Sequence, residues 1–128
     1  MLSFELVSPA KKLASAEAEA VTIPGMEGDL TAMENHAPFL STLRPGFVVV
    51  RQGSSEEKYF VTGGFAEISD NVVSVLAEEA VSAETVTTDW LDARIAEAEE
   101  AHEGASEDRK QATLQRVHDL TALRSTVN

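Results

Sequence analysis

Three histidines are the first candidates for chemistry in this sequence, because histidine acts as an acid–base catalyst and as a metal ligand near neutral pH. His36 lies in a segment that contains proline, whereas His102 and His118 lie in segments of helical periodicity. None of them has a second histidine four residues away with a glutamate between, which is the spacing of a helical zinc site. A surface or interface role is therefore the simpler interpretation of all three.

Acidic side chains offer a second route to metal binding, but their pattern favours a solvated surface. Four of them share one expected helix: Glu97, Glu99, Glu100 and Glu103. Such a dense row of acids is typical of a water-exposed helix face. The sequence also has no cysteine, which excludes thiolate metal sites, disulfides and cysteine nucleophiles. We therefore expect neither a metal nor a cofactor.

Glycines and serines likewise form no recognisable catalytic motif. Residues 24–29 have glycines suited to a tight loop but lack the Gly-Lys-Ser/Thr of a phosphate-binding loop. The pair Gly63-Gly64 precedes a segment that alternates like a strand, so it predicts a bulge or a close approach of two backbones. No Gly-x-Ser-x-Gly elbow accompanies the serines. These patterns predict a protein without catalytic residues of its own.

Composition and charge point to a protein partner. The 128 residues have the apolar and charged fractions of a globular domain, and 22 acidic against 10 basic side chains give a net charge of −12. A field of that sign repels nucleic acid and anionic lipid headgroups. The longest uncharged run, residues 35–43, is far shorter than the roughly 20 residues of a membrane-spanning helix. The start of the sequence also lacks a signal-peptide pattern, so we expect a cytoplasmic protein that is not inserted in a membrane.

Residues 1–85 have the pattern of an all-β domain, a sandwich or barrel of about ten short strands. Apolar runs at residues 47–50, 59–62 and 72–76 are separated by Gly, Asn and Ser at regular intervals. Residues 13–20 are ambiguous, because alternating Ala and Glu favour a helix. The stop at Pro24-Gly25 allows only a short element, and we interpret it as a strand. Its faces would then be Glu17, Glu19, Val21 and Ile23 on one side and Ala16, Ala18, Ala20 and Thr22 on the other.

Residues 86–128 change to helical periodicity and predict an antiparallel hairpin. A first helix would be capped by Thr88 or Asp89 and end at Gly104. Ser106 would cap a second helix after a link of two or three residues, with acids in its first turn. Its apolar stripe consists of Leu114, Val117, Leu120, Leu123 and Val127. So few apolar residues hold two helices only marginally, which makes the hairpin a candidate moving part.

Four blocks of the first domain closely resemble the epsilon subunits of F-type ATP synthases, whose mitochondrial counterpart is called delta. They are FELVSP (residues 4–9), IPGMEGDLTAMENHAPFLSTLRPG (residues 23–46), VTGGFAEI (residues 61–68) and VLAEEA (residues 75–80). One block would be weak evidence, whereas four in order are specific. The resemblance implies a β-sandwich followed by a helical hairpin, with no catalytic activity of its own.

The resemblance also implies partners. It implies that the sandwich, residues 1–85, joins the gamma shaft to the polar loops of the membrane c-ring, as a peripheral rotor subunit in the central stalk on the cytoplasmic side of the bacterial inner membrane. Loop residues Met26, Glu27, Gly28 and Asp29 would meet the ring, and Ser8, His36 and Ser41 would lie near the gamma and ring contacts. The acids Glu27 and Asp29 suit basic ring loops, although capping of turn N–H groups explains them as well.

The hairpin, residues 86–128, is a possible regulatory domain by the same resemblance. Many members bind ATP through Leu-Asp-x-x-Arg-Ala, whereas this sequence has Leu91-Asp92-Ala93-Arg94, with the arginine one position early. Residues two apart on a helix point in nearly opposite directions, so Asp92 and Arg94 form a doubtful nucleotide site, and a pair between Arg94 and Glu97 is the simpler expectation. Inhibitory members press a basic second helix on the alpha/beta catalytic head, but residues 106–128 are nearly neutral, which predicts weak or absent inhibition.

Three functions follow from these patterns. The first is a non-catalytic, torque-coupling rotor subunit of a proton-translocating ATP synthase. The second is an ATP sensor whose hairpin closes over the nucleotide, which would show as ATP-dependent protection of the helices. The third is an enzyme built on the sandwich, which would require a convergent set of reactive groups. Co-purification with a gamma-type shaft separates the first from the other two.

Overall fold

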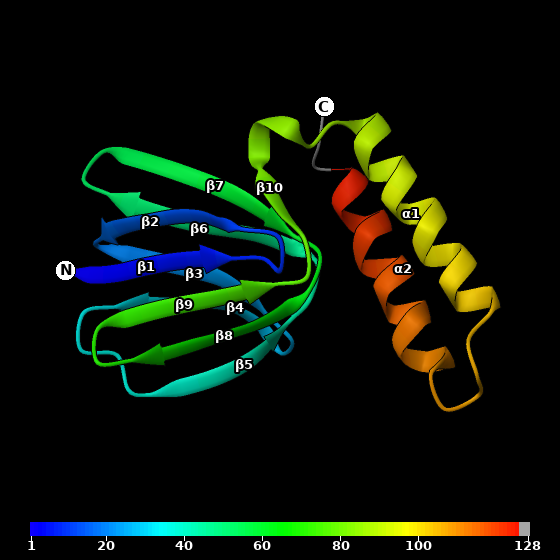
Figure 1. Cartoon of the computed structure of the whole chain (residues 1–128), viewed down its shortest axis with the longest axis horizontal. Coiled ribbons are helices and arrows are strands. Elements are labelled where there is room, and N and C mark those ends of the chain that lie inside the picture. Colours follow the sequence, from blue (N-terminus) through cyan, green and yellow to red (C-terminus); the bar gives the residue numbers. More distant parts are fainter. Residues whose placement is uncertain (126–128) are drawn as a thin grey trace. The chain divides into compact units, whose positions relative to one another are not determined.

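A computed structural model describes residues 1–125 and divides the chain into two compact units. The first unit is Met1–Ala83 and the second is Glu84–Asn128 (Figure 1). Val127, which we expected at the end of an apolar stripe, lies outside the described residues.

The first unit contains ten short strands, as the sequence predicted. They are short because Gly, Pro, Asn or Ser interrupts the chain every five to ten residues. The strands are β1 (Leu2–Val7), β2 (Lys12–Ala18), β3 (Ala20–Gly25), β4 (Gly28–Met33), β5 (Phe39–Leu43), β6 (Gly46–Gln52), β7 (Ser55–Val61), β8 (Gly64–Ser69), β9 (Val72–Ala77) and β10 (Ala80–Ser82).

The strands form a sandwich of two layers joined at one corner (Figure 1). Hydrogen bonding follows the order β10-β7-β6-β3-β5-β8-β9-β1-β2, with β4 on the other edge of β3. All neighbours are antiparallel except β1 and β9. The layers meet where β3 touches β5 at a single residue pair, Gly25 and Leu43, and pairs with β6 over Ala20 to Thr22. The chain therefore passes from one layer to the other between β5 and β6, at residues 44–45.

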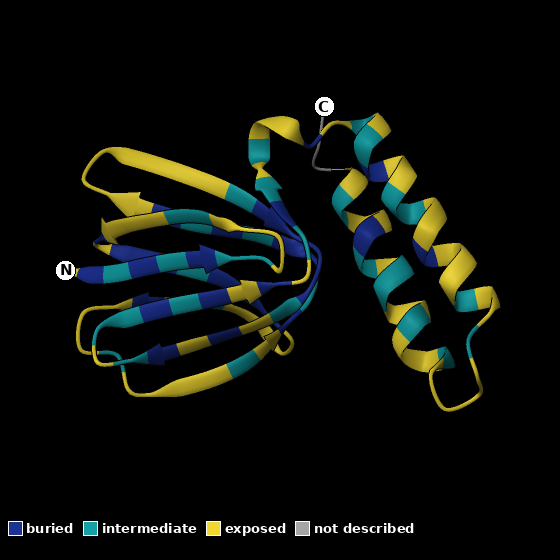
Figure 2. Ribbon diagram, in the orientation of Figure 1, coloured by how far each residue is buried: buried dark blue, intermediate teal, exposed yellow. Residues whose placement is uncertain are grey.

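The core lies between the layers and is made by strand alternation. In β1, Leu2, Phe4 and Leu6 are buried while the residues between them are half-exposed (Figure 2). Burying each such side chain stabilises the fold by about 1.5–3 kcal/mol. The same alternation holds in β6, β8 and β9. This inward–outward alternation leaves one face of each layer free to meet a partner.

The segment with helical propensity is a strand, as expected, but its predicted faces are wrong. The chain bends at Glu19 between β2 and β3, and Ala18 and Ala20 are buried together with Val21 and Ile23. Backbone N–H of Glu19 donates to the carbonyl of Arg51, and the Glu19 carboxylate accepts from the N–H of Gly53. These bonds to the end of β6 and to the turn that follows it reset the alternation at Glu19.

The predicted close backbone approach occurs at Gly64. Its φ is +124°, and a Cβ atom there would lie 2.1 Å from the carbonyl oxygen of Leu76. Only glycine allows β8 and β9 to come this near at their paired ends.

A 3₁₀ turn (Ala83–Thr85) spans the boundary between the units, and the second unit then contains α1 (Thr88–Glu103) and α2 (Lys110–Arg124). Thr87 caps α1, one residue before the expected caps, because its hydroxyl accepts from the N–H of Trp90 at 3.1 Å. Gly104 ends α1 as predicted. The prediction for α2 is wrong: Ser106 donates to the Asp108 carboxylate instead of capping, and the helix begins only at Lys110.

The two helices pack against each other through few apolar side chains, and polar contacts occur at both ends. Leu91, Ala98 and Leu120 are buried, whereas Leu114 of the predicted stripe is exposed. Near the connecting turn, His102 Nδ1 lies 2.7 Å from the Thr113 hydroxyl. Within residues 1–125, neither helix has the length and apolar character needed to cross a membrane.

Candidate functional site

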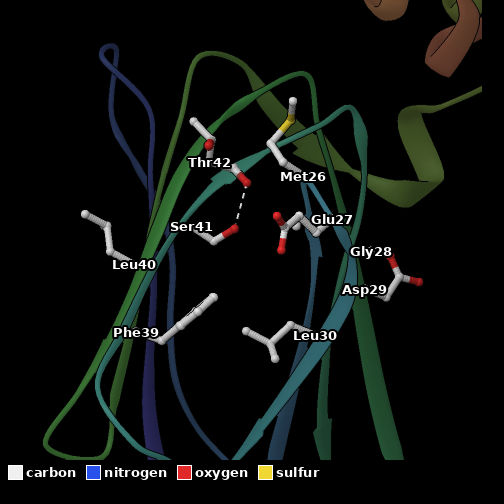
Figure 3. A pocket seen from close by; sticks show the side chains of 10 residues that line it. Met26, Glu27, Gly28, Asp29, Leu30, Phe39, Leu40, Ser41 and Thr42 are labelled. Carbon is white, nitrogen blue, oxygen red and sulfur yellow. Dashed lines mark hydrogen bonds between the residues drawn. The ribbon is translucent and has the colours of Figure 1, made fainter.

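Five of the residues predicted to bind partners line one pocket at the side of the sandwich. This side pocket has a volume of 460 Å³ and lies between β4 and β5, which do not pair with each other (Figure 3). Figure 3 shows Phe39, Ser41, Leu30 and Glu27 directed toward its centre, whereas Leu40 points away. Its lining is Gly25, Met26, Glu27, Gly28, Asp29, Leu30, Phe39, Leu40, Ser41 and Thr42.

A tight hairpin between β3 and β4 positions the acidic end of this pocket. Gly25 pairs with Gly28, so only Met26 and Glu27 form the turn. A Cβ on Gly25 would lie 2.8 Å from the carbonyl oxygen of Gly28, which explains the glycine there. The N–H of Met26 donates to the carbonyl of Thr42 at 3.0 Å and ties the turn to β5.

The two acids of this turn differ in their surroundings. Asp29 forms an ion pair with Arg44 at 2.9 Å, and Arg44 Nε also donates to the carbonyl of Gly25. Asp29 is therefore held in place by its own chain. Glu27 is exposed, and its side chain makes no hydrogen bond or ion pair within residues 1–125. Its carboxylate at the pocket is free to meet a cationic side chain.

An exposed apolar surface adjoins the side pocket. Met26, Phe65 and Leu76, here called the apolar patch, are 54%, 46% and 43% exposed. They line a second pocket of 650 Å³, which shares Met26 and Thr42 with the side pocket. Register places Thr42, Phe65 and Leu76 in one row across β5, β8 and β9. Contiguous exposed apolar side chains of this kind mark interaction sites.

Phe65 and Leu76 are functional candidates that the sequence-based prediction missed. Both carry a sequence signal, since their neighbours along the strand, Ala66 and Val75, belong to the buried alternation. A large apolar side chain in the opposite, outward phase is therefore expected to be exposed.

The two remaining predicted partner residues lie in different places. Ser8 lines the second pocket, and its hydroxyl donates to the carbonyl of Lys11 at 3.3 Å. His36 lies beyond the end of β4 that is remote from Gly28, and its Nδ1 is 2.7 Å from the carbonyl oxygen of Ala37. The structure thus brings six of the seven residues to one end of the sandwich and leaves His36 apart.

The two candidate nucleotide ligands do not converge. Asp92 pairs with Arg124 of α2 at 2.5 Å, and this arginine holds the pKa of Asp92 below its usual range. Arg94 pairs with Glu97 at 3.5 Å, as predicted, and lies 4.4 Å from the centre of the Trp90 ring. Over residues 1–125, no group of three potential metal-ligating side chains occurs.

Residues 1–83 match the family described as the ATP synthase delta/epsilon chain, beta-sandwich domain. The chain is 47% identical over 125 residues to an ATP synthase epsilon chain of Cereibacter sphaeroides, covering 98% of this chain and 95% of the relative. It is 44% identical over 120 residues to an epsilon chain of Jannaschia sp., covering 94% and 91%.

Solved structures share the fold. A chain in the Euglena gracilis mitochondrial ATP synthase (OSCP/F1/c-ring, rotational state 1) matches with a TM-score of 0.75 and 23% identity, covering 98% of this chain and 80% of that one. A chain in the central stalk and c-ring of the Tetrahymena thermophila enzyme matches with a TM-score of 0.53 and 20% identity, covering 63% and 66%.

Proposed function

This chain belongs to the ATP synthase delta/epsilon family, and we propose that it joins the gamma shaft to the c-ring in the rotor of that complex. As an epsilon-type chain it is a structural or regulatory subunit, not a catalytic one, and it associates with the complex as a peripheral component. We place it on the cytoplasmic side of the bacterial inner membrane.

The main support for this proposal is that the apolar patch and the acidic β3–β4 turn lie together at one end of the sandwich. Met26 belongs to both, so a partner that covers the patch also reaches Glu27. An apolar centre with charges at its margin is the usual anatomy of a protein interface. We assign Met26, Glu27, Gly28 and Asp29 to the c-ring contact and Ser8 and Ser41 to the junction of gamma and ring.

His36 takes part in a separate contact in this proposal. His36 lies beyond the end of β4 that is opposite the β3–β4 turn. Because β4 has six residues, its two ends are roughly 17 Å apart. One partner loop does not span both positions easily, so His36 would meet a different part of gamma or the ring.

The hairpin contributes little inhibition in this proposal. Of the basic residues in α2, Arg124 is engaged with Asp92 of α1, and Lys110 donates to the carbonyl of His102. Few positive charges are left to attract the acidic catalytic head. ATP sensing is less well supported, because Asp92 and Arg94 each have a partner within the hairpin.

Site-specific cross-linking tests the interface. The sequence contains no cysteine, so a single introduced cysteine gives a unique attachment point. We expect short-reach cross-links from positions 29 and 41, in the assembled complex, to attach to gamma or to the c subunit. Position 54, in the exposed β6–β7 turn at the other end of the sandwich, is the matched control. Attachment of 29 and 41 to neither subunit, or equal attachment from 54, would refute the assignment.

A further inference from the structure

The sandwich has four edge strands, and three of them are protected against pairing with another chain. β10 is only three residues long. β2 carries Lys12 and Glu17, and β4 carries Asp29. β5 has the sequence FLSTL, without charge or proline. Short length and charge are the usual means of blocking an edge, so β5 is the exception.

The backbone of β5 presents hydrogen-bonding groups at its free edge. The Thr42 carbonyl accepts from Met26 on the side of β3, so Thr42 directs its backbone groups away from β8. Backbone direction alternates along a strand. Leu40 therefore directs its N–H and C=O to the same free side, whereas Ser41 directs its own toward β8. Within residues 1–125, no strand pairs with β5 on this side before Leu43.

The space beside this edge can accept side chains of an added strand. It is the side pocket of 460 Å³, with Phe39 and Leu30 directed into it, whereas the side chain of Leu40 points away from its centre and is 66% exposed (Figure 3). At one end the carboxylate of Glu27 has no partner within the described part of the chain. The pocket thus offers an apolar surface, a free backbone edge and one negative charge.

We propose that an extended segment of a neighbouring subunit adds to the free edge of β5 as a further strand. Its backbone exchanges hydrogen bonds with Leu40, an apolar side chain enters the pocket against Phe39 and Leu30, and a lysine or arginine faces Glu27. Strand addition gives affinity through the backbone and specificity through alternate side chains. The inference rests on the proposed function, since it takes the neighbour to be a subunit of the ATP synthase complex.

Two substitutions at one position separate strand addition from side-chain docking. Leu40→Pro removes the N–H at the free edge and places the proline ring there. The backbone hydrogen bonds of Phe39 and Ser41 to β8 are kept, and proline is tolerated at such edge positions. Leu40→Ala removes the same side chain but keeps the N–H. With ATP synthase complex depleted of this subunit, we expect Leu40→Pro to rebind roughly tenfold or more weakly than Leu40→Ala. Circular dichroism checks that both variants are folded.

Amide exchange in the wild-type chain tests the same point if the proline variant does not fold. The Leu40 amide should exchange rapidly in the isolated chain and become protected in the complex, whereas the Ser41 amide is protected in both. Equal rebinding of the two variants, or a Leu40 amide that stays unprotected in the complex, overturns strand addition. Formation of a dimer of this chain through β5 would also overturn it. If the wild-type chain fails to rebind, the proposed function itself is wrong.

Discussion

The most discriminating test of the fold concerns two glycines with similar backbone angles and different surroundings. Gly64 has φ +124° and Gly28 has φ +134°, so an alanine at either position is strained to a similar degree, about 1–3 kcal/mol. A Cβ at Gly28 would meet no atom within 4 Å, whereas at Gly64 it would lie 2.1 Å from the Leu76 carbonyl oxygen and 2.9 Å from the Cα of Ala77. Both obstacles are backbone, which cannot rotate away.

We therefore expect Gly64→Ala to lower the free energy of unfolding by about 1–3 kcal/mol more than Gly28→Ala does, because overpacking adds to the strain. The total loss for Gly64→Ala is then about 2–6 kcal/mol, or at least about 8 °C in melting temperature for a unit of this size. Urea unfolding followed by far-ultraviolet circular dichroism measures both variants. Equal destabilisation by the two substitutions would show that β8 and β9 are not as close as described.

Three further outcomes are expected. Burial first, and then the hydrogen bond to Glu57, raise the pKa of Tyr59 to about 12, so absorbance titration of this single tyrosine should show ionisation near that pH, and Glu57→Gln should lower the pKa but keep it above 10. Because the pKa is higher in the folded state, the sandwich should lose stability as pH rises from about 10 to 12. A titration midpoint near 10 in the wild type would contradict this. Because Arg124 lowers the pKa of Asp92, their ion pair stabilises the hairpin above about pH 4, and this stabilisation is lost as pH falls through the lowered pKa. Asp92→Asn should therefore reduce the acid-induced change in Trp90 fluorescence. An unchanged acid transition would exclude the pair as its cause. Removal of residues 87–128 should leave ATP hydrolysis by the complex nearly unchanged, and a many-fold rise would show that the hairpin inhibits.

The strands were predictable because their signals are local. Val73 and Val75 alternate with less buried residues, and a turn precedes them at Asp70-Asn71, where both φ angles are positive. Gly104 ended α1 for the same local reason. Glycine and asparagine impose turns whatever the rest of the chain does.

Errors arose where a distant contact or a competing hydrogen bond decided the structure. The bend at Glu19 depends on Arg51 and Gly53, more than thirty residues away, and no local periodicity contains that information. Ser106 had the right residue type for a helix cap, but its hydroxyl bonds to Asp108 instead. Short polar side chains regularly choose between such local partners.

The candidate site was predicted in and beside the β3–β4 turn and at Ser41 of β5, but not across β8 and β9. The turn at Met26 and Glu27 carries its own glycine signal, and the resemblance drew attention to it. Phe65 and Leu76 belong to the site through strand register, since they lie in one row across β8 and β9. Register between strands is a tertiary property, so the sequence indicated that each residue faces outward but not that they meet.

The open side of the sandwich follows from the corner that joins its layers. Gly46 begins β6 directly after Pro45, and a Cβ on Gly46 would lie 2.8 Å from the Cβ of Pro24, so the corner requires this glycine. Because β5 leaves β3 at that corner, β4 and β5 become edges that face each other without pairing, and the side pocket lies between them. In a sandwich without a partner at this opening, both edges need to be covered or charged to prevent pairing with other chains. The uncharged β5 edge therefore argues that the opening is kept for a partner strand, and that the corner which shapes the fold also shapes the binding site.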